Sequence, residues 1–182
     1  MDLFLVRHGE AAASWGESTD PGLSELGREQ AVAAAQILQP QASADTRLVS
    51  SPLARAQETC TPLAQALQRD VAIDDVFCEV PSPVPLEQRQ DWLRGFMQQE
   101  WAEQEESLLA WRDSAYARLL SFDAPTVVFT HFLVINAVVG VIEDYPATLR
   151  FWPDNGSITH LRHTGERLEL VALGAEIETR VN

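Results

Sequence analysis

Residues 3–10 are Leu3-Phe4-Leu5-Val6-Arg7-His8-Gly9-Glu10, an apolar run that passes abruptly into charged and polar side chains. A short apolar run rich in β-branched and aromatic residues predicts a buried strand. In an open α/β sheet, ligands bind outside the carboxyl ends of the strands, where loops and helix N-termini expose backbone N–H groups. We therefore expect Arg7, His8 and Gly9 to lie at a ligand site.

Further apolar runs of the same kind predict strands along the rest of the chain. Their ranges are 46–50, 71–78, 126–130, 157–162 and 167–173. Amphipathic stretches between them predict a helix from Ser24 to a stop at Pro40, a helix that starts at Ser51-Pro52, and a helix over 132–142. Because strand and helix alternate, we predict an α/β protein with a mostly parallel sheet covered on both faces. The last two strands are predicted to form a hairpin through Thr164-Gly165-Glu166.

Residues 79–122 differ from the rest of the sequence. Three closely spaced prolines, at 81, 83 and 85, predict a rigid extended connection, and polar helical sequence follows it. We therefore predict one domain over residues 1–182, in which this segment forms a small helical lid or insertion. Three tryptophans of the segment are expected to pack against the sheet: Trp92, Trp101 and Trp111.

Composition excludes several classes of protein. With 46% hydrophobic and 22% charged residues, the chain has the balance of a soluble globular domain. A formal net charge of −14 repels polyanions, so nucleic acid is not an expected partner. No apolar run approaches the about 18 residues that cross a membrane, and the N-terminus lacks a basic leader, so we expect a cytoplasmic protein without membrane contact. Cys60 and Cys78 lack the spacing of a disulfide framework or zinc site, and the oligomeric state stays open.

Two further predicted strands end close to Arg55 and His131, so two histidines and two arginines are expected at one edge. A neutral imidazole is a nucleophile toward phosphorus near neutral pH, and His8 is placed for that role. Phosphoryl transfer also needs positive groups around the equatorial oxygens, which Arg7, Arg55 and a protonated His131 would supply. Gly9 is expected to let the backbone approach the phosphate.

A phosphatase also needs an acid that protonates the leaving oxygen and later accepts a proton from water. Glu79, at the end of the third predicted strand, is the candidate, and Glu10 is the reserve. His160 and His163 are three residues apart on a predicted strand, so their side chains point to opposite faces. We therefore expect no metal ion and no cofactor.

Five blocks of sequence carry these residues in order. They are Leu5-Val6-Arg7-His8-Gly9-Glu10, Leu23-Ser24-Glu25-Leu26-Gly27-Arg28-Glu29-Gln30-Ala31, Ser50-Ser51-Pro52-Leu53-Ala54-Arg55-Ala56-Gln57-Glu58-Thr59, Val128-Phe129-Thr130-His131 and Asn155-Gly156-Ser157-Ile158-Thr159. Together they resemble the histidine phosphatase superfamily, also called phosphoglycerate-mutase-like. The resemblance implies a three-layer α/β/α sandwich with a small helical lid. It also implies that His8 is the phosphorylated nucleophile, that Arg7, Arg55 and His131 form the phosphate pocket, and that Glu79 is the acid.

The chain departs from the family pattern in three places. Ala11 and Ser14 stand where many members have serine or threonine and asparagine, so one phosphate contact is expected to be weaker or replaced. Phe132-Leu133 follow the second histidine where many members have glycine, so the pocket edge is expected to be narrower and more apolar. Residues 79–83 lack the glycine and tryptophan pattern that often follows the acid.

The resulting hypothesis is a phosphatase that hydrolyses a phosphate monoester or phosphoramidate through a phosphohistidine on His8. Its substrate would be a phosphorylated small molecule or a phosphohistidine protein. A phosphoglycerate-type mutase is an alternative, but it needs extra cations, and residues 79–122 offer only arginines at 89, 94, 112 and 118 in an acidic context. A catalytically silent phosphate-binding module is a further alternative. The presence of all four predicted pocket residues argues against it: His8, Arg7, Arg55 and His131.

Overall fold

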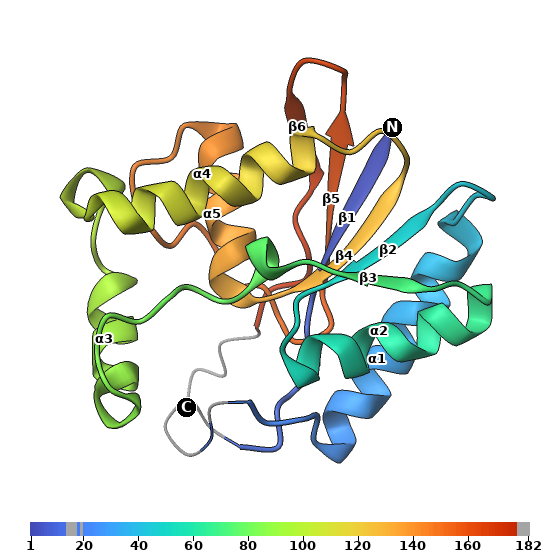
Figure 1. Cartoon of the computed structure of the whole chain (residues 1–182), viewed down its shortest axis with the longest axis horizontal. Coiled ribbons are helices and arrows are strands. Elements are labelled where there is room, and N and C mark those ends of the chain that lie inside the picture. Colours follow the sequence, from blue (N-terminus) through green and yellow to red (C-terminus); the bar gives the residue numbers. More distant parts are fainter. Residues whose placement is uncertain (14–17, 19, 178–182) are drawn as a thin grey trace.

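The computed structural model describes residues 1–13, 18 and 20–177, which form one mixed sheet flanked by helices. The strands are β1 (Asp2–Arg7), β2 (Arg47–Ser50), β3 (Val71–Ile73), β4 (Thr126–Thr130), β5 (Ile158–His163) and β6 (Leu168–Ala172). Their order across the sheet is β3-β2-β4-β1-β5-β6 (Figure 1). The first four run parallel, whereas β5 is antiparallel to β1 and β6 is antiparallel to β5. The predicted mostly parallel sheet with a terminal hairpin is confirmed.

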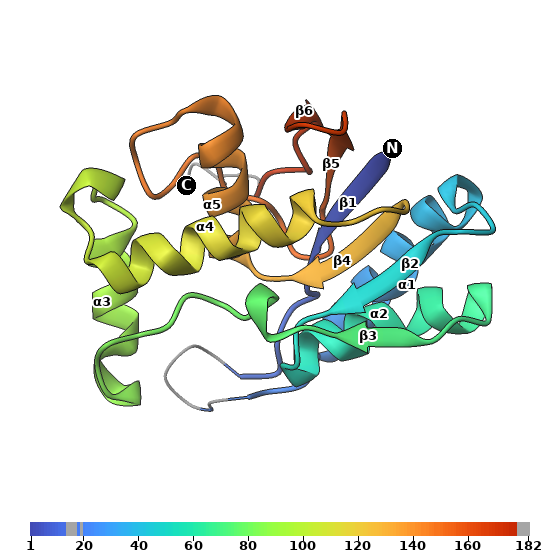
Figure 2. The same ribbon diagram turned by 45° about the horizontal axis from the view of Figure 1, so that its top comes forward.

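Helices cover both faces of the sheet. α1 (Glu25–Leu38) and α2 (Ala54–Leu67) lie on one side, and α4 (Glu106–Leu120) and α5 (Phe132–Glu143) lie on the other (Figure 2). Successive side chains of β1 point to opposite faces, so Leu3 and Leu5 enter the core under α4 and α5, while Phe4 and Val6 enter the core under α1 and α2. A strand buried on both sides explains the uninterrupted apolar run, and the predicted three-layer architecture is confirmed.

Two element boundaries differ from those predicted. β3 ends at Ile73, not at 78, because the Asp74 side chain accepts a hydrogen bond from the backbone N–H of Val76 and starts a 3-10 turn over Asp75–Phe77. The second helix begins at Ala54, not at Ser51-Pro52. The first helix is as expected: Ser24 is its N-cap and accepts a hydrogen bond from Gly27 N–H at 3.0 Å.

The segment after β3 contributes to two parts of the fold. α4 packs on the sheet through Ala115 and Leu119 and so belongs to a covering layer. α3 (Arg89–Phe96) stands away from the sheet (Figure 1) and is attached to α5 through Leu93 and Phe96. Because α4 is part of a covering layer, only the part of residues 79–122 before α4 is available for the lid, whose role stays a prediction.

The two cysteines are free thiols, and none of the described helices is suited to span a membrane. Cys60 is buried, Cys78 is half-buried, and both are free. Within the part of the chain that the structure describes, no helix combines the length and apolar character that a membrane crossing requires.

Candidate active site

Five of the predicted site residues gather at the carboxyl ends of β1, β2 and β4 and in the loop after β3. They are Arg7, His8, Arg55, Glu79 and His131, with exposed fractions between 0% and 8%. Ionisable side chains are rarely buried together without a structural or functional reason. The structure thus brings together the residues that the sequence placed at separate strand ends.

The His8 ring is held in one orientation by two hydrogen bonds. Nδ1 lies 2.7 Å from the carbonyl oxygen of Gly9 and therefore carries the proton, which leaves a lone pair on Nε2. Nε2 accepts a hydrogen bond from Nε of Arg55 at 3.2 Å. Burial, followed by the charges of Arg55 and Arg7, lowers the pKa of His8 to about 3. His8 is therefore neutral near pH 7, as a nucleophile must be.

The backbone of Gly9 contacts two other parts of the chain, and its expected approach to the phosphate stays a prediction. Its N–H donates to the hydroxyl of Thr59 at 2.9 Å. A Cβ at Gly9 would lie 2.3 Å from the carbonyl oxygen of Gly27, and a Cβ at Gly27 would lie 2.1 Å from that of Glu10. Glycine stands here because the loop after β1 packs directly on the backbone of α1.

Part of the Arg7 guanidinium has no hydrogen-bond partner among the described residues. Nη1 donates to the carbonyl of Pro153 at 2.8 Å, and the guanidinium carbon lies 5.1 Å from the centre of the Phe132 ring. Nε is buried and has no hydrogen-bond partner among the described residues. Burial lowers the pKa of Arg7 to about 10, so the side chain stays charged at neutral pH. Phe132, which replaces the glycine of many family members, forms an apolar support for this charge.

His131 has one satisfied and one unsatisfied ring nitrogen. Its Nε2 lies 2.8 Å from the hydroxyl oxygen of Ser51, which also accepts a hydrogen bond from Leu53 N–H at 3.3 Å. Its Nδ1 is buried without a partner in the described ranges. Burial, followed by the charges of His8 and Arg55, lowers the pKa of His131 well below its usual value. This shift favours a neutral His131 near pH 7, and the predicted protonation of His131 beside a phosphoryl group stays a prediction.

The two candidate acids lie in different surroundings. Glu79 is buried in the loop beyond β3; its Oε1 accepts a hydrogen bond from Val80 N–H at 2.9 Å, and its Oε2 accepts one from Leu133 N–H at 3.5 Å. Burial raises the pKa of Glu79, and the Val80 hydrogen bond and the charge of Arg55 oppose that rise. Glu10 is exposed and accepts a hydrogen bond from the hydroxyl of Ser24 at 2.6 Å, at the N-terminus of α1. Of the two candidate acids, Glu79 is therefore the one that lies within the cluster of buried ionisable residues.

Several residues that support the cluster were not recognised from the sequence. Ser51 was interpreted as a helix cap, yet its hydroxyl contacts His131. The Thr59 hydroxyl donates to the Arg55 carbonyl at 2.6 Å. Asp20 accepts a hydrogen bond from Ala54 N–H at 2.8 Å and lies 4.0 Å from Nη1 of Arg55. Ser51 and Thr59 belong to the third sequence block, so the block was a signal, but the contacts of Ser51 with His131 and of Thr59 with Gly9 join distant parts of the chain.

The backbone of His8 has a partner from the fifth block. Asn155 donates to the carbonyl of His8 at 3.1 Å.

The first departure from the family pattern lies at Ala11 and Ser14. Ala11 forms an isolated antiparallel bridge with Leu23. Ser14 lies outside the described residues, so the consequence of the missing asparagine there stays a prediction.

The remaining histidines are occupied elsewhere. His160 contacts Asp2 at 2.8 Å, and His163 contacts the carbonyl of Leu120 at 2.8 Å. Among residues 1–13, 18 and 20–177, no group of three or more histidine, cysteine, aspartate or glutamate side chains is arranged to hold a metal ion.

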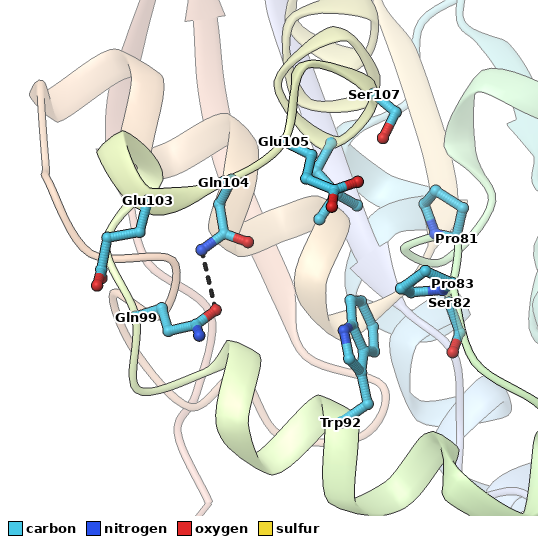
Figure 3. A pocket seen from close by; sticks show the side chains of 10 residues that line it. Pro81, Ser82, Pro83, Trp92, Gln99, Glu103, Gln104, Glu105 and Ser107 are labelled. Carbon is cyan, nitrogen blue, oxygen red and sulfur yellow. Dashed lines mark hydrogen bonds between the residues drawn. The ribbon is translucent and has the colours of Figure 1, made fainter.

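A separate groove of about 360 Å³ lies between the proline-rich connection, α3 and the start of α4. Figure 3 shows Trp92 on one side of it and the carboxylate of Glu105 on another, with Pro81 and Pro83 nearby. Trp92 stacks on Phe96 with ring centres 5.3 Å apart, so the expectation that it packs against the sheet is wrong. None of the buried residues of the candidate site lines this groove.

The family model of the histidine phosphatase superfamily (branch 1) matches residues 3–176. The chain belongs to the histidine phosphatase superfamily. Membership supports an enzyme of the histidine phosphatase class, and it confirms the resemblance of the sequence blocks.

Solved structures of phosphatases share the fold. Mycobacterial glucosyl-3-phosphoglycerate phosphatase Rv2419c, solved with VO3, has a TM-score of 0.73 at 23% identity over 96% of this chain and 99% of that one. Phosphoserine phosphatase from Entamoeba histolytica, solved with 3-phosphoglyceric acid, has a TM-score of 0.76 at 22% identity over 96% of both chains. At these identities the likeness establishes the fold.

Curated relatives match only part of this histidine phosphatase chain. Bifunctional protein Rv2228c of Mycobacterium tuberculosis is 40% identical over 81 residues, which are 42% of this chain and 22% of that protein. Uncharacterized protein Mb2253c of Mycobacterium bovis matches with the same identity and the same shares. The match thus spans about a fifth of the length of these relatives.

Proposed function

We propose that this chain hydrolyses phosphate monoesters or phosphoramidates through a phosphohistidine intermediate on His8. One observation supports it above all: a neutral, buried His8 whose Nε2 lone pair lies beside the guanidinium of Arg55. Nε of Arg7 is a buried donor without a partner among the described residues, and Nδ1 of His131, which carries the proton in one of the two neutral tautomers, is a second buried nitrogen without one. Phosphoryl oxygens are the acceptors that fit this set of donors.

In the first step, Nε2 of His8 attacks phosphorus, the N–P bond forms and the P–O bond to the leaving group breaks. The leaving oxygen takes the proton of Glu79, whose pKa is raised by burial so that the acid form persists to higher pH. As substrate binds, Arg55 turns from Nε2 of His8 to a phosphoryl oxygen, which frees the Nε2 lone pair for this attack.

In the second step, water attacks phosphorus on the side opposite His8. Its proton passes to the Glu79 carboxylate, the N–P bond breaks, and inorganic phosphate leaves while the electron pair returns to Nε2 of His8. Throughout, Arg7 and Arg55 offset the charge on the transferred group, which is the main contribution that phosphoryl transfer asks of a protein. Glu79 regains its proton and is ready for another substrate.

The proposed substrate is a small phosphorylated molecule, and the proposed unit is one domain over 1–182 with the lid within 79–122. The solved neighbours are named for such molecules: one is a glucosyl-3-phosphoglycerate phosphatase and the other is a phosphoserine phosphatase. A protein phosphohistidine substrate and a mutase reaction are outcomes that the experiment below separates. A cytoplasmic location stays a prediction from the sequence.

Hydrolysis of an aryl phosphate by the wild type and by His8→Ala tests the proposal, with His160→Ala as the matched control histidine. We expect loss of turnover in His8→Ala only. After rapid quenching with labelled substrate, we expect an acid-labile, base-stable phosphoryl adduct on His8. Label on a serine, or equal rates in wild type and His8→Ala, would refute the mechanism. Two further substrates separate the alternatives. With 3-phosphoglycerate, isomerised phosphoester without free phosphate would instead identify a mutase, and turnover of a phosphohistidine protein alone would identify the protein substrate.

A further inference from the structure

The segment that leads into β5 forms one wall of the candidate active site. Nη1 of Arg7 donates to the carbonyl of Pro153 at 2.8 Å, and the side chain of Asn155 donates to the carbonyl of His8 at 3.1 Å. Trp152 directly precedes Pro153 in the chain. Its backbone therefore lies at the edge of this wall.

The side chain of Trp152 is exposed and lies against the aromatic ring that supports Arg7. Its ring centre is 5.4 Å from that of Phe132, and the two rings are tilted by 59°. The guanidinium carbon of Arg7 lies 5.1 Å from the centre of the same Phe132 ring. Phe132 is 2% exposed, whereas Trp152 is 48% exposed. One buried ring thus separates an exposed indole from the guanidinium of Arg7.

Phe132 also connects Trp152 to the side of the site where Glu79 lies. Phe132 packs in one apolar group with Val80, the residue after Glu79. The residue after Phe132, Leu133, donates its N–H to Oε2 of Glu79 at 3.5 Å. Because Glu79 is the proposed proton donor to the leaving oxygen, Trp152 borders the side of the pocket from which the leaving group departs.

Hydrogen bonds hold the backbone around Trp152. The side-chain oxygen of Asn136, in α5, accepts a hydrogen bond from the N–H of Phe151 at 3.0 Å. The N–H of Trp152 donates to Oε1 of Glu176 at 3.1 Å, and its carbonyl accepts from the N–H of Ile177 at 2.9 Å. A large aromatic side chain on a fixed backbone loses little conformational entropy when a ligand packs on it. Trp152 is therefore suited to contact a ligand.

The charges around Trp152 favour an uncharged ligand group. The carboxylate of Glu176 contacts the Trp152 backbone, and Asp154 is two residues further along the same segment. These carboxylates disfavour an anionic group, and the guanidinium of Arg7 disfavours a cationic one. An uncharged ring packs on an indole through apolar area and through the favourable geometry of its edge or face.

We propose that Trp152 binds an uncharged ring on the leaving group of the substrate, either an aryl or a sugar ring. This inference rests on the proposed function. Arg7 and Arg55 hold the transferred phosphoryl group, Glu79 protonates the leaving oxygen, and the ring then packs on the exposed indole. The preferred substrates are phosphate monoesters whose leaving group carries such a ring.

Matched pairs of esters of primary alcohols test the ring site. Benzyl phosphate and propyl phosphate differ by an aryl ring, and glucose 6-phosphate and glycerol 3-phosphate differ by a sugar ring. In the wild type, kcat/KM is expected to favour the ring-bearing member of at least one pair, and the pair that responds identifies the ring. Trp152→Ala is expected to reduce that preference by about 5- to 10-fold, the effect of one aromatic contact. Trp152→Phe retains a ring and is expected to keep most of the preference.

Tyr145→Ala is the matched control, because it removes another exposed aromatic side chain that follows the far end of α5. Its preference is expected to equal that of the wild type. Equal losses on both members of each pair in Trp152→Ala would show that Trp152 acts on Arg7 through Phe132, and would overturn the ring site. The absence of a ring preference in the wild type, or an unchanged preference in Trp152→Ala, would overturn it as well.

Binding of phosphonates, which are not hydrolysed, separates the ring site from the proposed reaction. In calorimetric titrations, benzylphosphonate is expected to bind the wild type more tightly than propylphosphonate if the aryl pair responds, and the phosphonate analogues of the sugar pair serve otherwise. Trp152→Ala is expected to abolish the difference. A difference in binding that depends on Trp152, in a protein that turns over none of the esters, would refute the proposed function and leave the ring site standing. Turnover of the esters together with equal binding of the two phosphonates would do the reverse.

Discussion

The hydroxyl oxygen of Ser51 lies 2.8 Å from Nε2 of His131, whereas Nδ1 of the same ring has no partner among the described residues. Because burial and nearby positive charge keep His131 neutral, one of its nitrogens carries a proton and the other accepts. The Ser51 hydroxyl has two acceptors in reach, Nε2 of His131 and Sγ of Cys78 at 3.9 Å, and we propose the arrangement in which it donates to Nε2 and the His131 proton resides on Nδ1. A neutral His131 can then donate to a phosphoryl oxygen, and protonation is unnecessary.

This arrangement predicts that Ser51 is a positioning residue. Ser51→Ala removes the hydrogen-bond partner of Nε2, so both tautomers of His131 become populated and kcat/KM for an aryl phosphate is expected to fall about tenfold, the effect of one lost hydrogen bond. Nitrogen chemical shifts of the labelled His131 ring should show the mixed tautomers. Ser51→Thr retains the hydroxyl and should restore both the shifts and the rate. An Nδ1-protonated ring in Ser51→Ala would contradict this role.

The two ionisable groups of the proposed reaction predict its pH profile. His8 loses its nucleophilic lone pair only below its pKa of about 3, so kcat/KM should not decline through the pKa of about 6.5 of an ordinary histidine. Glu79 must be protonated to act as the acid, and its pKa is raised, so kcat/KM should fall as the pH rises through that value. Steady-state kinetics across the pH range would measure both limbs. A steep acid limb near the ordinary histidine value would refute the assignment.

Glu79→Gln should slow esters with poor leaving groups far more than esters with good ones. Protonation matters most when the departing oxygen is strongly basic, so the slope of log kcat/KM against leaving-group pKa should become steeper in the variant. Glu10→Gln is the matched control, because Glu10 is exposed beside Ser24. A uniform loss across leaving groups in Glu79→Gln would mean that Glu79 positions other groups instead.

The buried His8 also predicts a dependence of stability on pH. Its pKa is lower in the folded protein than in the unfolded chain, so the unfolded chain binds more protons and the free energy of unfolding should fall as the pH drops below about 6.5 toward the folded value. One such group contributes a slope of about 1.4 kcal/mol per pH unit. Chemical denaturation at several pH values should show a smaller slope for His8→Gln. An equal slope in the two proteins would contradict the burial of a neutral imidazole.

The contact between the backbones of Gly9 and Gly27 predicts a severe loss of stability in Gly9→Ala. The added Cβ would meet a backbone oxygen, which cannot move aside, so a cost of about 3 kcal/mol or more is expected. Gly95, inside α3, has nothing within 4 Å of its added Cβ. Gly95→Ala should therefore stabilise the protein by roughly 0.5–1 kcal/mol, as in other helix interiors. Thermal unfolding of both variants measures the contrast.

Much of the fold was predictable because its signals are local. The apolar run of β1, the Ser24 cap of α1 and the turn at Gly165 each depend on residues close together in the chain. The end of β3 was predicted wrongly, since the bond from Val76 N–H to Asp74 competes with an otherwise continuous apolar pattern. Glu79 consequently lies in a loop and not at a strand end.

The sequence by itself determined that Arg7, His8, Arg55 and His131 stand at strand ends, because the period of apolar residues places those ends and parallel strands share one edge. Only the tertiary structure decided how these side chains are oriented, which hydrogen bonds they form and which protonation state they favour. Ser51 and His131 are 80 residues apart in the chain, and no local pattern encodes their hydrogen bond. The low pKa values of His8 and His131 and the unpartnered nitrogens of Arg7 and His131 likewise arise from burial, which exists only once the layers have packed.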